Sequence, residues 1–394
     1  MDPQIIEWLN LNVKWIHLIV GIAWIGASFY FNWLEGNLER NKPDLNTGVA
    51  GDLWAVHGGG FYHVEKFENS PEKLPDVLHW FKWEAYLTWI TGFAMMILVF
   101  YLAPSMYLLD ASVSDMSPGL AIGISLFSML AGWLIYDQLC KTKLVENGAL
   151  FFWIIFLGLT AVAFILTNLF SAKAAYIHVG AIIGSIMVAN VFFVIIPSQK
   201  TMVSAMENGQ VPDPMVGKRG FQRSLHNNYF TLPVLFIMIS GHYPLTFGSE
   251  YSWLVLAAIS LIGVFVRHYF NLKNRGQKKV WMLPAAAILM AILAYLTMPK
   301  KPETTLVSAV SYQQISPVIK QRCATCHAVQ PTDVAFKSAP KGVALETQAD
   351  LERHADMVYA QTVTTHAMPI GNLTKMTEQE RVLLNAWYQG FKAE

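Results

Sequence analysis

Long apolar stretches are the feature of this sequence that most limits how the chain can fold. Crossing a hydrocarbon core of about 30 Å takes roughly 20 helical residues. No basic segment precedes the first stretch, so we expect a retained helix and not a signal peptide. The sequence thus predicts an all-α fold, with a polytopic transmembrane bundle of about eight helices in residues 1–299. The stretches lie at about residues 11–33, 81–103, 118–140, 149–170, 174–197, 229–247, 252–270 and 280–298.

Composition supports a membrane protein. Of the 394 residues, 54% are hydrophobic and only 14% are charged, whereas soluble proteins carry about 25% charged residues. This chain has too few charges to cover a soluble surface of its size, so the lipid bilayer is its expected partner. The net charge is +1 and no block of like charge stands out, which argues against a nucleic-acid partner.

Lysine and arginine are distributed unevenly between the predicted connections. Alternate loops hold fourteen of them, whereas the N-terminal tail and the other loops hold only Lys173. Since positive residues favour the cytoplasmic side, we predict that both termini face away from the cytoplasm. Lys300 and Lys301, just after the last stretch, count against this orientation. The fourteen are Arg40, Lys42, Lys66, Lys73, Lys141, Lys143, Lys200, Lys218, Arg219, Arg223, Lys273, Arg275, Lys278 and Lys279.

After Pro299 the apolar stretches stop, and residues 300–394 have the mixed composition of a soluble domain. We expect helices around residues 305–321 and 378–390. The motif Thr377-x-x-Glu380 is typical of a capping box at the start of the second helix.

A single motif in this second domain indicates its chemistry. Cys323-Ala324-Thr325-Cys326-His327 has the C-x-x-C-H pattern that attaches a c-type haem, with His327 as a ligand of the haem iron. A CxxC redox pair and half of a zinc site are the alternatives. Zinc would need a second ligand pair, and the remaining cysteine, Cys140, lies in a membrane stretch.

Met368, 41 residues beyond His327, is the predicted second axial ligand of the haem iron. His/Met ligation raises the haem potential and suits an electron acceptor. Residues 300–394 are therefore predicted to be a class I-like cytochrome c domain, placed in the periplasm because c-type attachment takes place outside the cytoplasm in bacteria. The competing ligands are Met357, Met376, His354 and His366.

Two histidines lie at matched depth near the predicted periplasmic ends of their helices. His17 and His178 are candidates for bis-histidine ligation of a second haem, of b type, because facing helices of a bundle build such sites. The alternative is that each is a hydrogen-bonded packing residue.

Polar residues near the predicted cytoplasmic face form a second layer, and ionisable groups in membrane spans are functional candidates. Planar cationic and amide donors of this layer would suit a planar anion, although positive-inside topology with snorkelling explains them equally well. The tetrapeptide His57-Gly58-Gly59-Gly60 has no GxSxG nucleophile elbow to accompany it, so its glycines indicate a tight bend of the backbone or its close approach to a ligand. The donors are Arg223, His226, Asn227, Asn228, Arg267 and His268.

The arrangement, with HGGGFYH at 57–63, SLHNNYFTLPVLFIMIS at 224–240, RHYFN at 267–271 and MPIGNLTKMTEQER at 368–381, resembles the bacterial integral-membrane urate oxidases. These are the cytochrome c-linked urate hydroxylases of the PuuD family. The resemblance implies oxidation of urate to 5-hydroxyisourate with water in purine catabolism. Electrons would pass through haem c to cytochrome c and a terminal oxidase.

Within this interpretation, urate binds on the cytoplasmic side, with His226, Arg267 or His268 as base and anion clamp and Phe61 or Tyr62 stacking on the ring. A periplasmic haem would lie about 30 Å away. Either an intermediate carrier such as a haem b or a substrate site nearer the periplasm is then required. The rival hypotheses are a respiratory electron-transfer subunit with a quinol or cytochrome partner, and a transporter or sensor with a redox-reporting domain.

Overall fold

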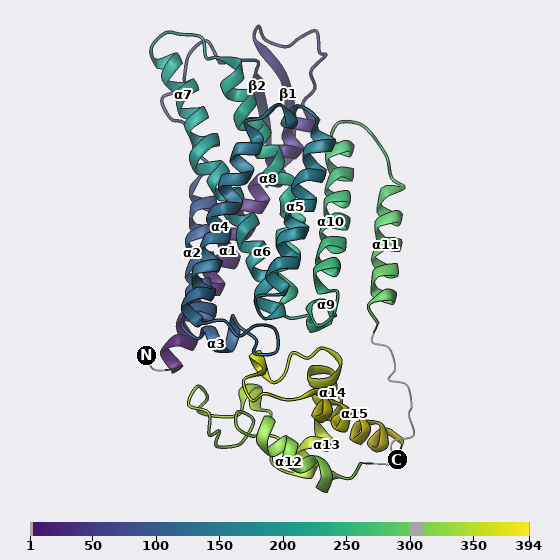
Figure 1. Cartoon of the computed structure of the whole chain (residues 1–394). Coiled ribbons are helices and arrows are strands. Elements are labelled where there is room, and N and C mark those ends of the chain that lie inside the picture. Colours follow the sequence, from purple (N-terminus) through teal and green to yellow (C-terminus); the bar gives the residue numbers. More distant parts are fainter. Residues whose placement is uncertain (1–2, 299–309, 394) are drawn as a thin grey trace.

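The computed structural model describes residues 3–298 and 310–393, which are mostly helical. Figure 1 shows long helices side by side, a two-stranded hairpin at one end and a small helical unit at the other. The α-helices are α1 Pro3–Asn37, α2 Trp83–Met96, α3 Pro104–Tyr107, α4 Pro118–Cys140, α5 Gly148–Thr167, α6 Ala172–Ala189, α7 Ile196–Glu207, α8 Pro214–Ser240, α9 Pro244–Phe247, α10 Ser252–Asn274, α11 Met282–Leu296, α12 Tyr312–Arg322, α13 Gln348–Arg353, α14 Ala355–Tyr359 and α15 Glu378–Ala393. The strands are β1 Val49–His57 and β2 Gly60–Phe67, and the π-helical turns are η1 Ile97–Tyr101, η3 Asn190–Ile195 and η5 Ala360–Thr364. Short 3-10 helices are η2 Lys143–Glu146, η4 Pro340–Gly342 and η6 Ile370–Asn372.

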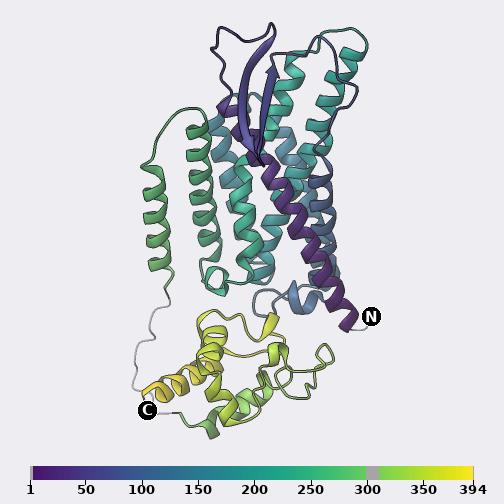
Figure 2. The same ribbon diagram turned by 180° about the vertical axis from the view of Figure 1, so that it is seen from behind.

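Several helices are long and apolar enough to cross a membrane, as the sequence predicts. Seen from behind, α1 runs along the outside of the bundle from the C-terminal unit to the hairpin (Figure 2). Within the described residues six segments qualify: Gln4–Asn37, Trp83–Tyr101, Pro118–Cys140, Gly148–Thr167, Ala172–Glu207 and Ser252–Asn274.

Two of the eight predicted spans differ from the prediction. The stretch at 229–247 covers the second half of α8, which begins at Pro214 and ends at Ser240, together with the short helix α9; basic residues in the first half of α8 concealed its start. The stretch at 280–298 contains α11, whose 15 residues extend only about 22 Å, less than the thickness of a hydrocarbon core.

The all-α prediction is wrong for residues 49–67, where β1 and β2 form an antiparallel hairpin. Gly58 and Gly59 take φ values of 57° and 81°, as a tight two-residue hairpin turn requires, which confirms the predicted bend. Asp52 of β1 accepts hydrogen bonds from Lys42 and from His63 of β2, each at 2.9 Å. These contacts hold the hairpin together outside the apolar core.

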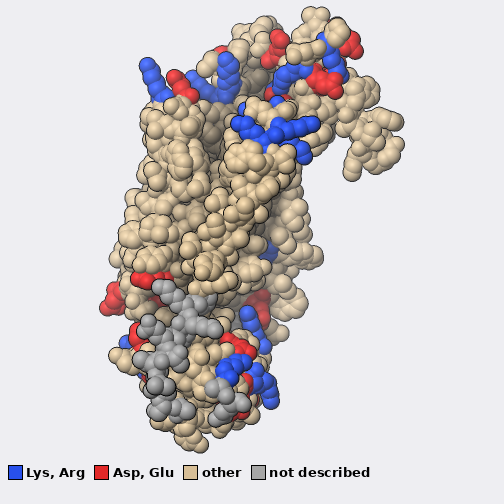
Figure 3. All heavy atoms as spheres, turned by 90° about the vertical axis from the view of Figure 1, so that its right-hand side faces the viewer, with Lys and Arg blue, Asp and Glu red and all other residues tan. Residues whose placement is uncertain are grey.

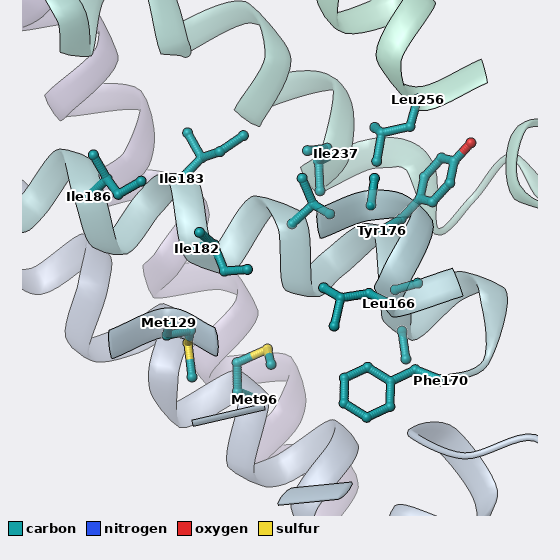
Figure 4. Close-up of a cluster of buried hydrophobic side chains, with 14 of the residues drawn as sticks. Met96, Met129, Leu166, Phe170, Tyr176, Ile182, Ile183, Ile186, Ile237 and Leu256 are labelled. Carbon is teal, nitrogen blue, oxygen red and sulfur yellow. The ribbon is translucent and has the colours of Figure 1, made fainter. Parts of the chain in front are cut away.

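Helix α6 lies at the centre of the membrane bundle. Figure 4 shows its side chains Tyr176, Ile182 and Ile186 meeting residues from neighbouring helices, among them Met129 of α4 and Ile237 of α8. All five side chains are buried. This packing fixes α4 and α8 on either side of α6, and α8 carries more of the buried polar side chains than any other helix described.

The C-terminal unit has its own apolar core, which includes Ile315, Leu351 and Trp387. The predicted capping box is confirmed at the start of α15: the Thr377 amide donates to Glu380 Oε2 (2.7 Å), and the Glu380 amide donates to Thr377 Oγ1 (3.3 Å). The predicted helix at 305–321 corresponds to α12. Its part before residue 310 and the predicted domain boundary at Pro299 lie outside the described residues.

Candidate functional site

A buried ion pair joins α4 to α8. Arg223 is only 5% exposed; its Nη2 donates to Asp137 Oδ1 (2.7 Å) and its Nη1 donates to Asn190 Oδ1 (3.0 Å). The other carboxylate oxygen of Asp137 meets Lys141 Nζ at 2.6 Å. Because this guanidinium has a carboxylate partner and an amide acceptor, its charge is compensated within the protein.

His226 belongs to the same network. Its Nδ1 lies 2.7 Å from the Tyr136 hydroxyl, and its ring stacks on Phe151 with centroids 5.0 Å apart. The Asn190 amide donates to the Tyr136 hydroxyl (3.2 Å) and to Asn227 Oδ1 (2.8 Å). Tyr136 is then free to donate to His226 Nδ1, which puts the proton of a neutral imidazole on Nε2.

The network depends on an irregularity in the backbone. Asn190 opens the π-helical turn η3 in the middle of the continuous helical segment Ala172–Glu207. Such turns insert one residue into a helix and often occur at functional sites. Here the turn aims a fully buried amide at Tyr136, Asn227 and Arg223 at once.

Arg267 lies in a different environment, between α10, α8 and α1. It is also 5% exposed, its Nε donates to Asn228 Oδ1 (2.9 Å), and its guanidinium carbon lies 4.1 Å from the centroid of the Phe29 ring. Within residues 3–298 and 310–393, no carboxylate forms a salt bridge with Arg267. This is a buried cation whose contacts are an amide and an aromatic face, so it has capacity for an anion.

The three predicted catalytic residues therefore do not share one cavity. His268 is exposed, and its Nδ1 lies 2.7 Å from the Tyr229 hydroxyl. His226 and Asn228 are two positions apart on α8 and so point about 200° apart around the helix, which puts His226 and Arg267 on opposite sides of it. Phe61 and Tyr62, the predicted stacking residues, are exposed on β2.

The predicted haem b ligands each have hydrogen-bond partners of their own. His17 Nδ1 is 3.0 Å from Thr91 Oγ1 on α2. His178 is fully buried, with Nδ1 at 2.7 Å from the Ala174 carbonyl and Nε2 at 2.7 Å from Ser125 Oγ. With both nitrogens of His178 engaged, the two side chains as packed do not fit a shared haem, and bis-histidine ligation stays a prediction from the sequence.

The cysteine motif follows α12 in a turn that suits haem attachment. The His327 amide donates to the Cys323 carbonyl (2.8 Å), and both cysteines are free thiols. Burial raises the pKa of the Cys323 thiol to about 12. His327 Nδ1 donates to the Val343 carbonyl (2.8 Å), which orients the ring and leaves Nε2 available as a metal ligand.

The Met368 segment is anchored through its backbone. The Met368 amide donates to the Gln361 carbonyl and its carbonyl accepts from Arg381 Nη1, both at 2.9 Å. Of the competing ligands, Met376 is buried in the core of the unit and Met357 is half exposed. In the described part of the chain, no group of three or more His, Cys, Asp or Glu side chains could hold a metal ion.

The C-terminal unit packs on the end of the bundle opposite the hairpin. The Ala111 amide donates to the Gly371 carbonyl at 3.3 Å, and Gly248 touches Thr365. Burial, with Cys326 and Asp333 of the C-terminal unit, raises the pKa of Tyr107 in α3. The C-terminal unit thus contacts the bundle through the segments around Thr365 and Gly371.

The sequence predicted Arg223, His226 and Arg267 as site residues but not the residues that contact them. Tyr136 and Phe29 were not singled out, because aromatic residues are common in such helices. Asn190 carried a readable signal, since it is a polar residue in the middle of a long apolar stretch.

The fold and these sites define a largely helical protein with several helices able to cross a membrane, buried arginine networks and a C-terminal unit that carries a C-x-x-C-H motif. A family model described as urate oxidase N-terminal matches residues 3–298. The chain belongs to this family. Comparison with curated proteins and with solved structures gave no match.

Proposed function

We propose that the protein oxidises urate to 5-hydroxyisourate and passes the electrons through a covalently bound haem c to cytochrome c and a terminal oxidase. Urate and water give 5-hydroxyisourate, two protons and two electrons. The observation that carries this proposal is the family match over residues 3–298 in the same chain as the motif at Cys323, Cys326 and His327.

The haem site fits the residues present. Cys323 and Cys326 would form the two thioether bonds that hold the haem, and His327 Nε2 and Met368 would hold its iron. When bound, haem c supplies an acceptor that takes one electron at a time. The hydrogen bond from His327 Nδ1 to Val343 orients the imidazole, and Arg381 holds the Met368 segment through its carbonyl.

Cationic and amide groups of the membrane bundle would bind the urate. Urate is a planar anion at neutral pH with several carbonyl acceptors, and Arg267 is the buried cation that has no carboxylate partner among the described residues. The roles of His226 and His268 as base remain predictions from the sequence. His226 is already engaged by Tyr136, so Arg267 has the stronger geometric support of the three.

We further propose that the hairpin end is cytoplasmic and the C-terminal unit periplasmic, in a bacterial inner membrane. Figure 3 shows Lys and Arg side chains gathered at the hairpin end, above a broad band with few charges. This distribution agrees with the positive-inside rule. A cytoplasmic catabolite would then enter near the hairpin and electrons would leave at the opposite end.

An anaerobic titration of the purified, oxidised full-length protein tests the function. Urate should be consumed and the haem reduced together, with two haems reduced per urate. The double variant Cys323→Ala/Cys326→Ala should lose the covalent haem, and a haem spectrum left in it would support a second haem.

Other outcomes separate the rival functions. Reduction by a quinol but not by urate would indicate a respiratory electron-transfer subunit. Urate uptake into vesicles without product would indicate a transporter.

A further inference from the structure

A hollow of about 540 Å³ opens at the hairpin end of the membrane bundle, between α1, α8 and α10. Its volume is within the range of roughly 300–1,000 Å³ found for small-molecule sites. Polar and cationic groups predominate in its lining. The residues that matter here are Asn32, Arg40, Phe221, Leu225, Asn271 and Arg275.

Unpaired hydrogen-bond donors lead from this hollow into the bundle. Asn271 lines it, is 8% exposed and has a buried Nδ2 without a hydrogen-bond partner in the described part of the chain. Arg275, Asn271 and Arg267 are spaced by four positions and so lie along one face of α10. Asn228, which accepts from Arg267, also has a buried Nδ2 with no partner among the described residues.

Buried donors without partners are rare in folded proteins, because each has lost its hydrogen bonds to water and has formed none within the protein. Asn271 and Asn228 each have such a donor, and both lie beside the buried guanidinium of Arg267. This arrangement indicates that a bound ligand supplies the missing hydrogen-bond acceptors. The acceptors must be oxygens or ring nitrogens, since amide NH₂ groups and a guanidinium only donate.

The charges around the hollow favour an anion. Glu35 is its one acidic lining residue, and both carboxylate oxygens are engaged, by Arg40 at 2.7 Å and by Lys66 at 2.5 Å. Arg275 at the mouth and Arg267, about two helical turns further inward, form no salt bridge with any carboxylate that the structure describes. Their positive charge is therefore available to a ligand.

Aromatic rings give the hollow a preference for flat molecules. Phe221 lines it, and Phe29 lies under the guanidinium of Arg267. A planar anion with several carbonyl groups could stack on Phe221 while its edge meets Asn271 and Arg275.

We propose that the hollow between α1, α8 and α10 binds such a planar organic anion through Asn271 and Arg275, which line it, with the buried charge of Arg267, held by Asn228, on its inner side. Resting on the proposed function, that anion is urate. The assignment puts the substrate on the side of α8 that faces away from His226.

Equilibrium dialysis of radiolabelled urate against the oxidised full-length protein in nanodiscs tests the site, together with KM and kcat for urate-dependent haem reduction. Asn271→Leu should weaken urate binding and raise KM at least about tenfold, the size expected for lost hydrogen bonds to a charged ligand. Its melting temperature should not fall, because the Asn271 Nδ2 has no partner to lose. Arg275→Ala, at the exposed mouth, should weaken binding without any risk to folding.

Arg219→Ala is the matched control. Arg219 is an exposed residue of α8 at the same end of the bundle and does not line the hollow, so its removal changes the local charge equally and should leave binding unchanged.

The outcomes separate this inference from the proposed function. Wild-type binding that Asn271→Leu and Arg275→Ala both leave intact overturns the site, even if urate is oxidised. Wild-type protein that binds no urate also overturns it. Variant-sensitive binding without any oxidation supports the site and overturns the proposed function.

Discussion

Docking of the C-terminal unit on the membrane bundle depends on two glycines. Gly371 of the C-terminal unit faces the bundle, and Gly248 of the bundle faces the C-terminal unit. A Cβ on Gly371 would lie 2.8 Å from the Met106 carbonyl oxygen and 3.0 Å from that of Leu109. A Cβ on Gly248 would lie 2.6 Å from the Thr365 carbonyl oxygen. These neighbours are backbone atoms, which cannot rotate away as a side chain can. We predict that alanine at either position displaces the C-terminal unit.

The magnitude follows from the contacts. Ordinary van der Waals contact begins near 3.4 Å, so the facing backbone must retreat by more than half an ångström. Overpacking of this kind costs about 1–3 kcal/mol, which lowers the docked population by about 5- to 150-fold. Gly371 has φ +54°, so alanine there adds about 1–2 kcal/mol of left-handed strain. Gly248 has φ −81°, and its alanine variant therefore isolates the clash.

Hydrogen–deuterium exchange and single-turnover haem reduction measure the effect. Gly248→Ala and Gly371→Ala should raise exchange in residues 104–111 and 365–372 together and slow the first electron transfer. Gly342→Ala is the control, because Gly342 has φ +70° with nothing within 4 Å of an added Cβ. If Gly248→Ala exchanges and reacts like the wild type, the close approach does not control docking and the reasoning is refuted.

Two further predictions concern stability. Arg223→Leu leaves the half-buried carboxylate of Asp137 with Lys141 as its remaining cation and removes the donor to the buried Asn190 Oδ1, so it should destabilise the bundle by about 1–3 kcal/mol, seen as a lower melting temperature in nanodiscs that Arg219→Leu does not reproduce. At the hairpin, hydrogen bonds from Lys42 and the neighbouring His63 hold the pKa of the Asp52 carboxyl below its usual range. The stabilisation is present above the unfolded-state pKa and is lost as pH falls through the lower folded-state pKa. Acid titration of hairpin tryptophan fluorescence should show this step, and replacing the aspartate by asparagine should abolish it.

The helices of the bundle could be read from the sequence because long apolar stretches have few alternatives to a helix in lipid. The hairpin at 49–67 was missed because its strands lie outside that apolar pattern and their pairing depends on the Gly58-Gly59 turn. The start of α8 was missed for a related reason: the helix begins among basic residues, and hydropathy alone detects only its apolar half.

Of the candidate site, only the depth of its residues in the membrane could be predicted. His226, Arg267 and His268 do occur near one level of the bundle, as loop charges and spacing indicated. Which side of a helix each residue faces is set by tertiary packing, and a helix turns about 100° per residue. His226 therefore lies against α4, Arg267 lies against α1, and the neighbouring His268 is exposed. The unpaired amide of Asn271 and the docking of Gly371 depend on contacts between distant segments, which one sequence does not encode locally.

The two possible positions of the substrate, on either side of α8, predict different effects of replacing His226. If urate lies between α1, α8 and α10, His226→Leu removes the acceptor of the buried Tyr136 hydroxyl and costs about 1–3 kcal/mol of stability, with KM for urate unchanged. Adding Tyr136→Phe should then recover part of that loss, because no orphaned hydroxyl remains, and a double-mutant cycle measures the recovery. If His226 is the general base, the same loss of stability is accompanied by a fall in kcat of about 10²–10⁴-fold, which adding Tyr136→Phe does not restore. That second result would move the substrate to the α4 side of α8 and refute the assignment to the hollow.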